Sequence, residues 1–337
     1  MAKILWKPKN IQKTHMFNFM NYINRSYGLQ LNSYQELHQW SVKNIPDFWK
    51  EIWAQSKIIH SNKYNNIIND MQKMPGAKWF PGARLNFAEN LLRFRNNNIA
   101  IYAIAENIPM RTLTYNELFL EVEALAHSLK SCGLKKGDRV VGFISNTPEA
   151  VVAMLATSAL GAIWSSASPD FGVKGALDRF KQIDPKIVFA SNGYHYNGKK
   201  FDLTEKLNSI IEELPSINQT VIINQLKIKK KEGLSFDFVY YDDFLCASPS
   251  RLQFEQVPFN YPLYIMYSSG TTGLPKSIVH SAGGTFIQHW KELYLHCNIT
   301  EKDTIFYFTT CGWMMWNWLV SALSIGSSIM LFDGAPF

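Results

Sequence analysis

Residues 264–280 read YIMYSSGTTGLPKSIVH, and this stretch decides which fold the sequence can adopt. The apolar run at residues 263–267 predicts a buried strand. The next nine residues, 268–276, hold two serines, two threonines, two glycines and one lysine. Glycines let backbone amides approach a phosphate closely, hydroxyl groups donate hydrogen bonds, and lysine supplies a compact positive charge. The segment therefore predicts a phosphate-binding loop at the end of a strand.

Two other interpretations of residues 268–276 were weighed. A Walker A loop needs a glycine directly before its lysine and a helix directly after it. Here Pro275 precedes Lys276, and the residues after Lys276 have an extended pattern, so both the spacing and the context fail. A plain surface hairpin is the second alternative, but a nine-residue run of this composition between two apolar strands argues against it.

Strands and helices alternate through the middle of the chain. Thr114 and Glu117 form a capping box, which predicts a helix that ends near Gly133. Thr147 and Pro148 predict the start of a second helix that runs to Leu160. Strands are predicted at residues 99–106, 139–144, 162–165, 187–190 and 220–224. This order predicts an α/β fold with mostly parallel sheets flanked by helices.

The two ends of the chain differ from this middle part. Residues 1–95 are rich in Asn, Lys and Trp and have a mixed helical pattern, which predicts a region that caps the following domain. We therefore expect a cap at residues 1–95 and a large domain at residues 96–337. Residues 313–332 carry no charge, but Gly326 and several polar residues interrupt them, which favours buried core over a membrane span. The last residues follow a predicted strand directly, and we expect this domain to be incomplete.

Composition excludes several classes of protein. The net charge of +7 comes from 34 basic and 27 acidic residues that are scattered, and the one dense run, residues 227–231, is interpreted as a solvated loop. We therefore expect anionic small molecules as ligands, with no nucleic acid and no membrane partner. The cysteines lack metal or disulfide spacing, and the first ten residues lack an apolar signal region, so we expect a cytoplasmic protein without a metal site of its own. These cysteines are Cys132, Cys246, Cys297 and Cys311.

Three stretches together resemble a known family. Residues 267–280, YSSGTTGLPKSIVH, are similar to the signature phosphate loop of the adenylate-forming superfamily. Residues 79–92, WFPGARLNFAENLL, resemble the N-terminal cap of acetyl-CoA-synthetase-like enzymes, and residues 309–337 resemble the corresponding stretch of the acetoacetyl-CoA synthetases. The resemblance runs from residue 6 to residue 337. Its one small departure is Cys311, where a hydroxyl residue is expected.

The resemblance implies an AMP-forming acid–thiol ligase that converts acetoacetate to acetoacetyl-CoA and uses ATP, Mg²⁺ and coenzyme A. The carboxylate would attack the α-phosphate of ATP to give an acyl-adenylate, and the thiol of coenzyme A would then displace AMP. Residues of the loop would offset phosphate charge. The resemblance assigns phosphate binding to Ser268, Ser269, Gly270, Thr271, Thr272, Gly273 and Lys276, of which Thr271, Thr272 and Lys276 are expected to act in catalysis.

The resemblance also implies two further binding segments. Residues 312–317 would line the acyl pocket, namely Gly312, Trp313, Met314 and Met315, with Trp316 limiting its depth and Asn317 as a polar partner for the keto group. Ordinary core is the alternative, and we prefer it for Trp318 and Leu319. Lys199 and Lys200 would meet the phosphates of coenzyme A, although a plain surface loop explains them nearly as well. His195 and His280 are interpreted as structural.

The family's later motifs, including a small C-terminal domain with a catalytic lysine, would lie beyond Phe337. We therefore expect this chain to be an N-terminal portion that is inactive or nearly so alone, with exposed apolar surface near residues 318–332. Three alternatives stay open. The chain could be a non-catalytic ATP-binding remnant, half of a split ligase whose other half is a separate chain, or part of a ligase for acetate or propionate.

Overall fold

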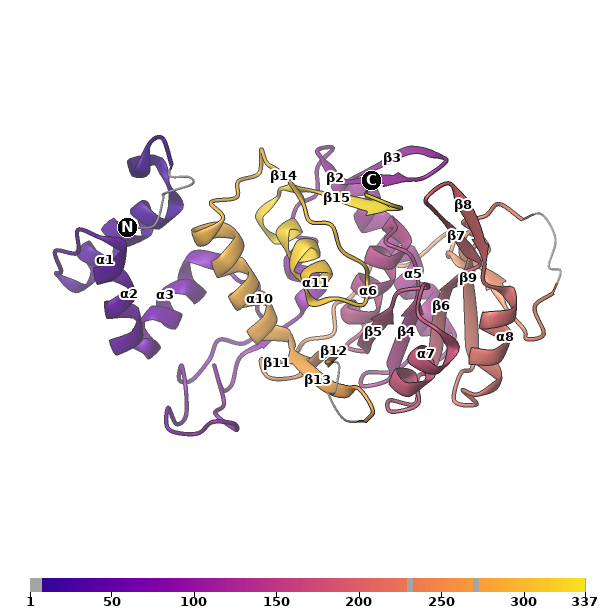
Figure 1. Ribbon diagram of the computed structural model, residues 1–337. Coiled ribbons are helices and arrows are strands. Elements are labelled where there is room, and N and C mark those ends of the chain that lie inside the picture. Colours follow the sequence, from indigo (N-terminus) through magenta and orange to yellow (C-terminus); the bar gives the residue numbers. More distant parts are fainter. Residues whose placement is uncertain (1–7, 229–232, 269–272, 337) are drawn as a thin grey trace.

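The computed structural model describes residues 8–228, 233–268 and 273–336 (Figure 1). The N-terminal region is mainly helical, as its sequence pattern predicts, and contains a single short strand. Figure 1 shows α1–α3 gathered at one end of the molecule, beside α10 and away from the larger sheet. The elements are a 3₁₀ turn (Ile11–Lys13), α1 (His15–Tyr27), α2 (Tyr34–Lys43), α3 (Ile45–Ser56), β1 (Arg84–Leu85) and α4 (Phe87–Leu91).

The larger sheet has seven strands in the order β10-β9-β6-β4-β5-β12-β13. Every neighbouring pair is parallel except β12 and β13, which are antiparallel. The predicted α/β fold with mostly parallel sheets is confirmed. The strands are β4 (Arg139–Phe143), β5 (Ile163–Ala167), β6 (Ile187–Ser191), β9 (Gln219–Ile223), β10 (Val239–Tyr240), β12 (Pro262–Ser268) and β13 (Lys276–Ser281).

Helices cover both faces of this sheet because successive strand residues point to opposite sides. Val140 belongs to a core cluster that includes all the large apolar residues of α6, whereas Val141 belongs to a second cluster with α7 and α8. Every residue of α6 is buried, which explains the continuous apolar run in its sequence. The helices of this part are α5 (Tyr115–Ser131), α6 (Pro148–Ala159), α7 (Val173–Phe180), α8 (Thr204–Glu212) and α9 (Tyr241–Phe244).

A second sheet has the order β14-β15-β2-β3. The strand β15 is parallel to both β14 and β2, so it lies inside this sheet although it comes last in the chain. Gly326 adopts a φ of 91° and separates the helical part of residues 313–332 from β15, as the sequence predicts. The strands are β2 (Ile99–Ala105), β3 (Ile108–Thr114), β14 (Thr304–Phe306) and β15 (Ser328–Asp333).

The remaining elements connect the two sheets or extend from them. They are β7 (Gly193–Tyr196), β8 (Lys199–Asp202), β11 (Val257–Pro258), α10 (Ala282–Lys291), a π-helical turn (Glu292–His296), α11 (Met314–Val320) and a 3₁₀ turn (Ser321–Ile325). In the part of the chain that the structure describes, no helix is long and apolar enough to cross a bilayer.

The predicted position of exposed apolar surface is wrong. Residues 319–324 and the core-facing residues of β15 are buried, because the 3₁₀ turn packs against α4 and α10 and β15 lies between β14 and β2. Four exposed aromatic side chains lie instead just before this segment. They are Phe306, Tyr307, Phe308 and Trp313, which are 49%, 44%, 47% and 63% exposed.

Gly142 lies in the middle of β4, where there is no room for a side chain. A Cβ atom at this position would lie 2.8 Å from two ring atoms of Trp164 and 2.9 Å from Cγ2 of Ile144. We expect Gly142→Ala to lower the free energy of unfolding by about 1–3 kcal/mol, because the indole ring of Trp164 is fully buried and must shift. Urea unfolding followed by circular dichroism measures this change.

Gly175→Ala is the matched control, since a Cβ there meets no atom closer than 3.8 Å and the residue lies inside α7. Removing a helix glycine should raise the free energy of unfolding by about 0.5–1 kcal/mol. A Gly142→Ala variant as stable as the parent chain would show that the side chains of Trp164 and Ile144 can shift without a cost in stability.

Candidate active site

The predicted phosphate loop is framed by β12 and β13. Ser268, the last residue of β12, is the Cα partner of Lys276, the first residue of β13, so the strand before the loop and the extended segment after it are both confirmed. Ser269, Gly270, Thr271 and Thr272 lie outside the described residues. Gly273 has a φ of +118°, a conformation that side chains rarely adopt, and Lys276 is exposed at the loop's exit.

The base of this loop is tied to the segment after α7. The Gln182 carboxamide donates from Nε2 to the Pro275 carbonyl at 2.9 Å and accepts from Ser277 Oγ at 2.9 Å. The Tyr267 hydroxyl donates to the Arg179 carbonyl at 3.0 Å, and burial raises the pKa of Tyr267 to about 12, so it remains a donor at neutral pH. These bonds fix both ends of the loop relative to α7.

Arg179 brings a positive charge close to the same place. Its guanidinium lies 4.6 Å from the ring centroid of Phe171 and 5.7 Å from that of Tyr267, within the range of cation–π attraction. Sequence reasoning did not assign a role to Arg179, Gln182 or the hydroxyl of Tyr267. Nothing in their local pattern distinguishes them from ordinary residues of an amphipathic helix and a strand.

Residues 309–317 cross the carboxyl ends of β4 and β5. Ser166 Oγ donates to the Cys311 carbonyl at 2.7 Å, and Cys311 Sγ lies 3.4 Å from the Ser145 carbonyl. Burial raises the pKa of the Cys311 thiol well above its ordinary value, so the thiol acts as a donor, as a hydroxyl would at this position. A Cβ on Gly312 would lie 3.5 Å from the Ser168 amide, so this residue runs close over β5.

The loop and residues 309–317 reach the same edge of the sheet. In the parallel pair of β12 and β5, Tyr264 is the partner of Trp164. Ser268 and Ser168 each lie four residues further on, so the two strands end at the same level, beside Gly312. Ligands of open α/β sheets bind at the carboxyl ends of the strands. This edge is therefore the candidate site.

The residues of α11 divide between surface and core. Trp313, just before the helix, is 63% exposed, and Met314 and Met315 are half-buried. Trp316 is fully buried, and its indole Nε1 donates to Asn146 Oδ1 at 2.9 Å. Residues 312–317 thus have a buried end, which Trp316 closes, and an exposed end, at which Trp313 lies.

A series of polar contacts links Asn317 of α11 to His289 of α10. Asn317 is 1% exposed, with Nδ2 at 3.2 Å from Met266 Sδ and no partner for Oδ1 among the described residues. Ser321 Oγ donates to the Asn317 carbonyl at 3.0 Å, and His289 Nδ1 lies 2.8 Å from Ser321 Oγ. Sequence reasoning missed His289, since a lone histidine on an apolar helix carries no motif.

His289 should make the stability of the chain depend on pH. Burial, with a smaller contribution from His280, lowers the pKa of His289 from 6.5 to about 3. Below pH 6.5 the His289 imidazole is therefore protonated in the unfolded chain, whereas in the folded chain it stays neutral down to about pH 3. The contribution of neutral His289 to the free energy of unfolding is fully present above pH 6.5. It is lost as the pH falls from 6.5 towards 3, at up to about 1.4 kcal/mol per pH unit.

We expect the free energy of unfolding to fall by about 2 kcal/mol more between pH 7 and pH 5 in the parent chain than in His289→Gln. Urea titrations at the two pH values measure both quantities. His38→Gln, which changes an exposed histidine of α2, should keep the parent's pH dependence. Equal pH dependence in His289→Gln and the parent chain would contradict the assignment.

The predicted coenzyme A segment is the β7–β8 hairpin. Lys199 and Lys200 are adjacent and exposed on β8, and Lys200 is the Cα partner of His195. The Glu106 carboxylate accepts from the amides of Asn197 and Gly198, at 2.9 and 2.8 Å, and from that of Ala335. These backbone donors, Ala335 first, lower the pKa of Glu106. The hairpin is therefore anchored to the turn between β2 and β3.

Comparison with known proteins places this site in a family. The family model of AMP-binding enzymes matches residues 87–337, which include the β12–β13 frame and residues 309–317. The chain belongs to the AMP-binding enzyme family. The model of the acetyl-coenzyme A synthetase N-terminus matches residues 34–91, which lie within the helical N-terminal region.

Three members of the AMP-binding family illustrate the match. The acetoacetyl-CoA synthetase of Danio rerio is 45% identical over 99% of this chain and 51% of its own length. The malonamoyl-CoA synthetase of Penicillium aethiopicum is 39% identical over 99% of this chain and 48% of its own length. The solved acetoacetyl-CoA synthetase from Streptomyces lividans is 39% identical with a TM-score of 0.93, over 99% of this chain and 52% of that one. The chain spans about half the length of these AMP-binding relatives.

Proposed function

We propose that this chain supplies the ATP- and acid-binding surfaces of an AMP-forming acid–thiol ligase that converts acetoacetate to acetoacetyl-CoA through an acyl-adenylate. The observation that carries the proposal is the match over 99% of the chain, in sequence and in fold, to proteins named acetoacetyl-CoA synthetase. We also propose a cap at residues 1–95 and an AMP-binding domain at residues 96–337; the two matched segments, 34–91 and 87–337, meet a few residues before this boundary.

ATP is proposed to bind at the edge where β12 and β5 end. Lys276 would contact a phosphate oxygen, with the hydroxyls and amides of residues 268–273 around the remaining ones. The exposure of Lys276 supports this, because its amine is accessible at the loop's exit. We place Mg²⁺ on the ATP phosphates, since this ion commonly binds through substrate phosphates and keeps several waters. Thr271 and Thr272 are proposed as the catalytic hydroxyls.

Acetoacetate is proposed to bind against residues 312–317. Gly312 leaves room beside Ser168, and Trp316 closes the inner end, which suits a short acid. Among the described residues, Asn317 Nδ2 donates to the Met266 sulfur, a weak acceptor, so a keto oxygen would be a better partner for it. Coenzyme A would meet Lys199 and Lys200 on the anchored hairpin.

The reaction is assigned to the cytoplasm. All four cysteines, Cys132, Cys246, Cys297 and Cys311, are free thiols, which suits a reducing compartment. A second chain that corresponds to the rest of the relatives' length is the proposed partner.

The test is acetoacetate-dependent exchange of pyrophosphate into ATP. It is run with this chain alone and mixed with a separately expressed second half of an acetoacetyl-CoA synthetase, with acetate, propionate and malonamate as comparison acids. Exchange that is fastest with acetoacetate supports the proposal, and restoration only on mixing supports a split ligase. A faster reaction with another acid overturns the substrate assignment. ATP binding without exchange in any mixture, with both pieces folded, supports a non-catalytic remnant.

A further inference from the structure

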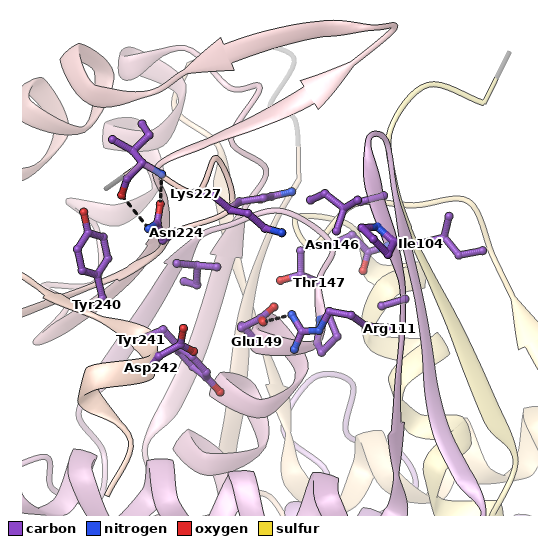
Figure 2. A pocket seen from close by; sticks show the side chains of 18 residues that line it. Ile104, Arg111, Asn146, Thr147, Glu149, Asn224, Lys227, Tyr240, Tyr241 and Asp242 are labelled. Atoms are coloured by element: carbon purple, nitrogen blue, oxygen red, sulfur yellow. Dashed lines mark hydrogen bonds and ion pairs between the residues drawn. The ribbon is translucent and has the colours of Figure 1, made fainter. Parts of the chain in front are cut away.

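A cavity of about 1090 Å³ lies between the two sheets, apart from the β12–β13 loop (Figure 2). One wall is the β2–β3 hairpin, and the other is formed by the first turn of α6 and by the residues that follow β9 and β10. Asn146 stands in the wall that the cavity shares with residues 309–316, because its Oδ1 accepts from Trp316 and its Nδ2 donates to the Thr309 carbonyl at 3.3 Å.

The hairpin side of the cavity is apolar apart from Arg111. Ala103 and Ala105 of β2 contribute only methyl groups, and Ile104, Ile108 and Pro109 border the same space. Tyr240 faces them from the opposite side, and Ile228 also lines the cavity. Because Ala103 and Ala105 are small, this side of the cavity leaves volume for an apolar group of about the size of a ring. Most small-molecule sites are likewise lined mainly by apolar side chains.

The inner end of the cavity is polar and has unused hydrogen-bonding capacity. Thr147 caps α6 without using its side chain, and its buried Oγ1 has no partner among the described residues. Gln225 is 9% exposed and donates through Nε2 to Asp333 at 2.6 Å, but its buried Oε1 also has no partner there. The first turn of the twelve-residue helix α6 adds partial positive charge at the same place.

One lysine at the rim, Lys227, extends from a turn that hydrogen bonds hold in place. Figure 2 shows the Lys227 side chain extending toward the first turn of α6. Its turn is fixed because the Asn224 side chain accepts from the Ile228 amide at 2.9 Å and donates to the Ile228 carbonyl at 3.0 Å. No ion pair involves Lys227 within residues 8–228, 233–268 and 273–336.

Besides Lys227, the charged side chains that line the cavity are those of Arg111, Glu149 and Asp242. Arg111 and Glu149 form an ion pair with each other, and the Glu149 side chain is 9% exposed. Asp242 is exposed at the start of α9 on the far side. The polar end thus combines the Lys227 ammonium, a helix N-terminus and two unused polar side-chain atoms.

We propose that this cavity binds an organic anion with an apolar body and a hydrogen-bond donor. The anionic group lies between Lys227 Nζ and the first turn of α6, the donor meets Gln225 Oε1, and the body lies along Ala103 and Ala105. This site is separate from the proposed ATP and acid sites and does not depend on the proposed ligase activity.

The test uses 8-anilinonaphthalene-1-sulfonate, which combines a sulfonate, an N–H group and aromatic rings. Its dissociation constant is measured by fluorescence at fixed ionic strength on the whole chain. We expect Lys227→Met and Ala105→Leu each to weaken binding at least fivefold. Lys43→Met, which removes an exposed charge from α2, should change it less than twofold. Circular dichroism checks that each variant is folded.

A neutral probe, N-phenyl-1-naphthylamine, separates the two ends of the site. Ala105→Leu should weaken its binding, whereas Lys227→Met should leave it unchanged, because the probe has no sulfonate. Unchanged binding of the sulfonate probe to Lys227→Met, or equal loss of both probes in that variant, would overturn the proposal. If Ala105→Leu does not fold, the comparison of the two probes on Lys227→Met still decides the question.

Discussion

Trp316→Ala is expected to lower the free energy of unfolding by about 3–5 kcal/mol, the typical cost of removing a large buried aromatic side chain. Trp316 is fully buried in the main core, so its removal leaves a cavity among packed apolar side chains. The substitution also removes the donor of Asn146 Oδ1, which is itself buried. Unfolding in urea, followed by tryptophan fluorescence and circular dichroism, measures the loss.

Trp313→Ala is the matched control in the same segment. Trp313 is 63% exposed, so its removal should change the free energy of unfolding by less than about 0.5 kcal/mol. If Trp313→Ala instead lowers acetoacetate-dependent exchange in the reconstituted ligase, its role is in acid binding and not in the core. A Trp316→Ala variant with the parent's stability would contradict the proposed closing of the pocket by a rigid core residue.

Lys276→Met is expected to slow acetoacetate-dependent exchange in the reconstituted ligase by about 10²–10³-fold, the typical cost of removing one preorganised donor that stabilises charge in a transition state. Methionine keeps the length of the side chain and removes its charge. Because Lys276 is exposed at the start of β13, the substitution should leave the stability of the chain unchanged.

Lys174→Met provides the comparison, because Lys174 is an equally exposed lysine whose amine pairs with Asp178 on α7. It should retain the parent's exchange rate within about twofold, as expected for an exposed side chain to which the proposed site gives no role. Full activity in Lys276→Met would remove this lysine from the mechanism. The affinity of the chain for ATP, measured by calorimetry, shows whether the loss arises in binding or in the later step.

Local patterns predicted most individual elements correctly. The capping box at Thr114 and Glu117 begins α5, Pro148 begins α6, and Gly326 ends the last helical turn. Each of these signals acts within a few residues, through a hydrogen bond or a backbone angle. The period-2 and continuous apolar runs likewise located β2, β4, β5, β6, β9 and β12 to within two or three residues at each end.

Long-range relations could not be predicted in the same way. The division of the strands into two sheets depends on which edges meet, and no residue in β2 or β15 encodes its partner. The error about exposed apolar surface has the same origin, because Leu319 and Leu331 are buried by elements distant in sequence. In the site, the phosphate loop carried a motif, whereas Gln182 and Arg179 support it through tertiary contacts that leave no local signal.

The central position of β15 has a consequence for how the chain is made. Ile329 pairs with Ile101, 228 positions earlier, and β14 can pair only after β15 is in place. At a synthesis rate of roughly 5–20 residues per second, β15 is synthesised about 10–45 seconds after β2. During that time the β2–β3 hairpin is marginally stable and offers an unpaired edge. A chaperone that shields strand edges would therefore have its best opportunity on this chain while the ribosome is still translating it.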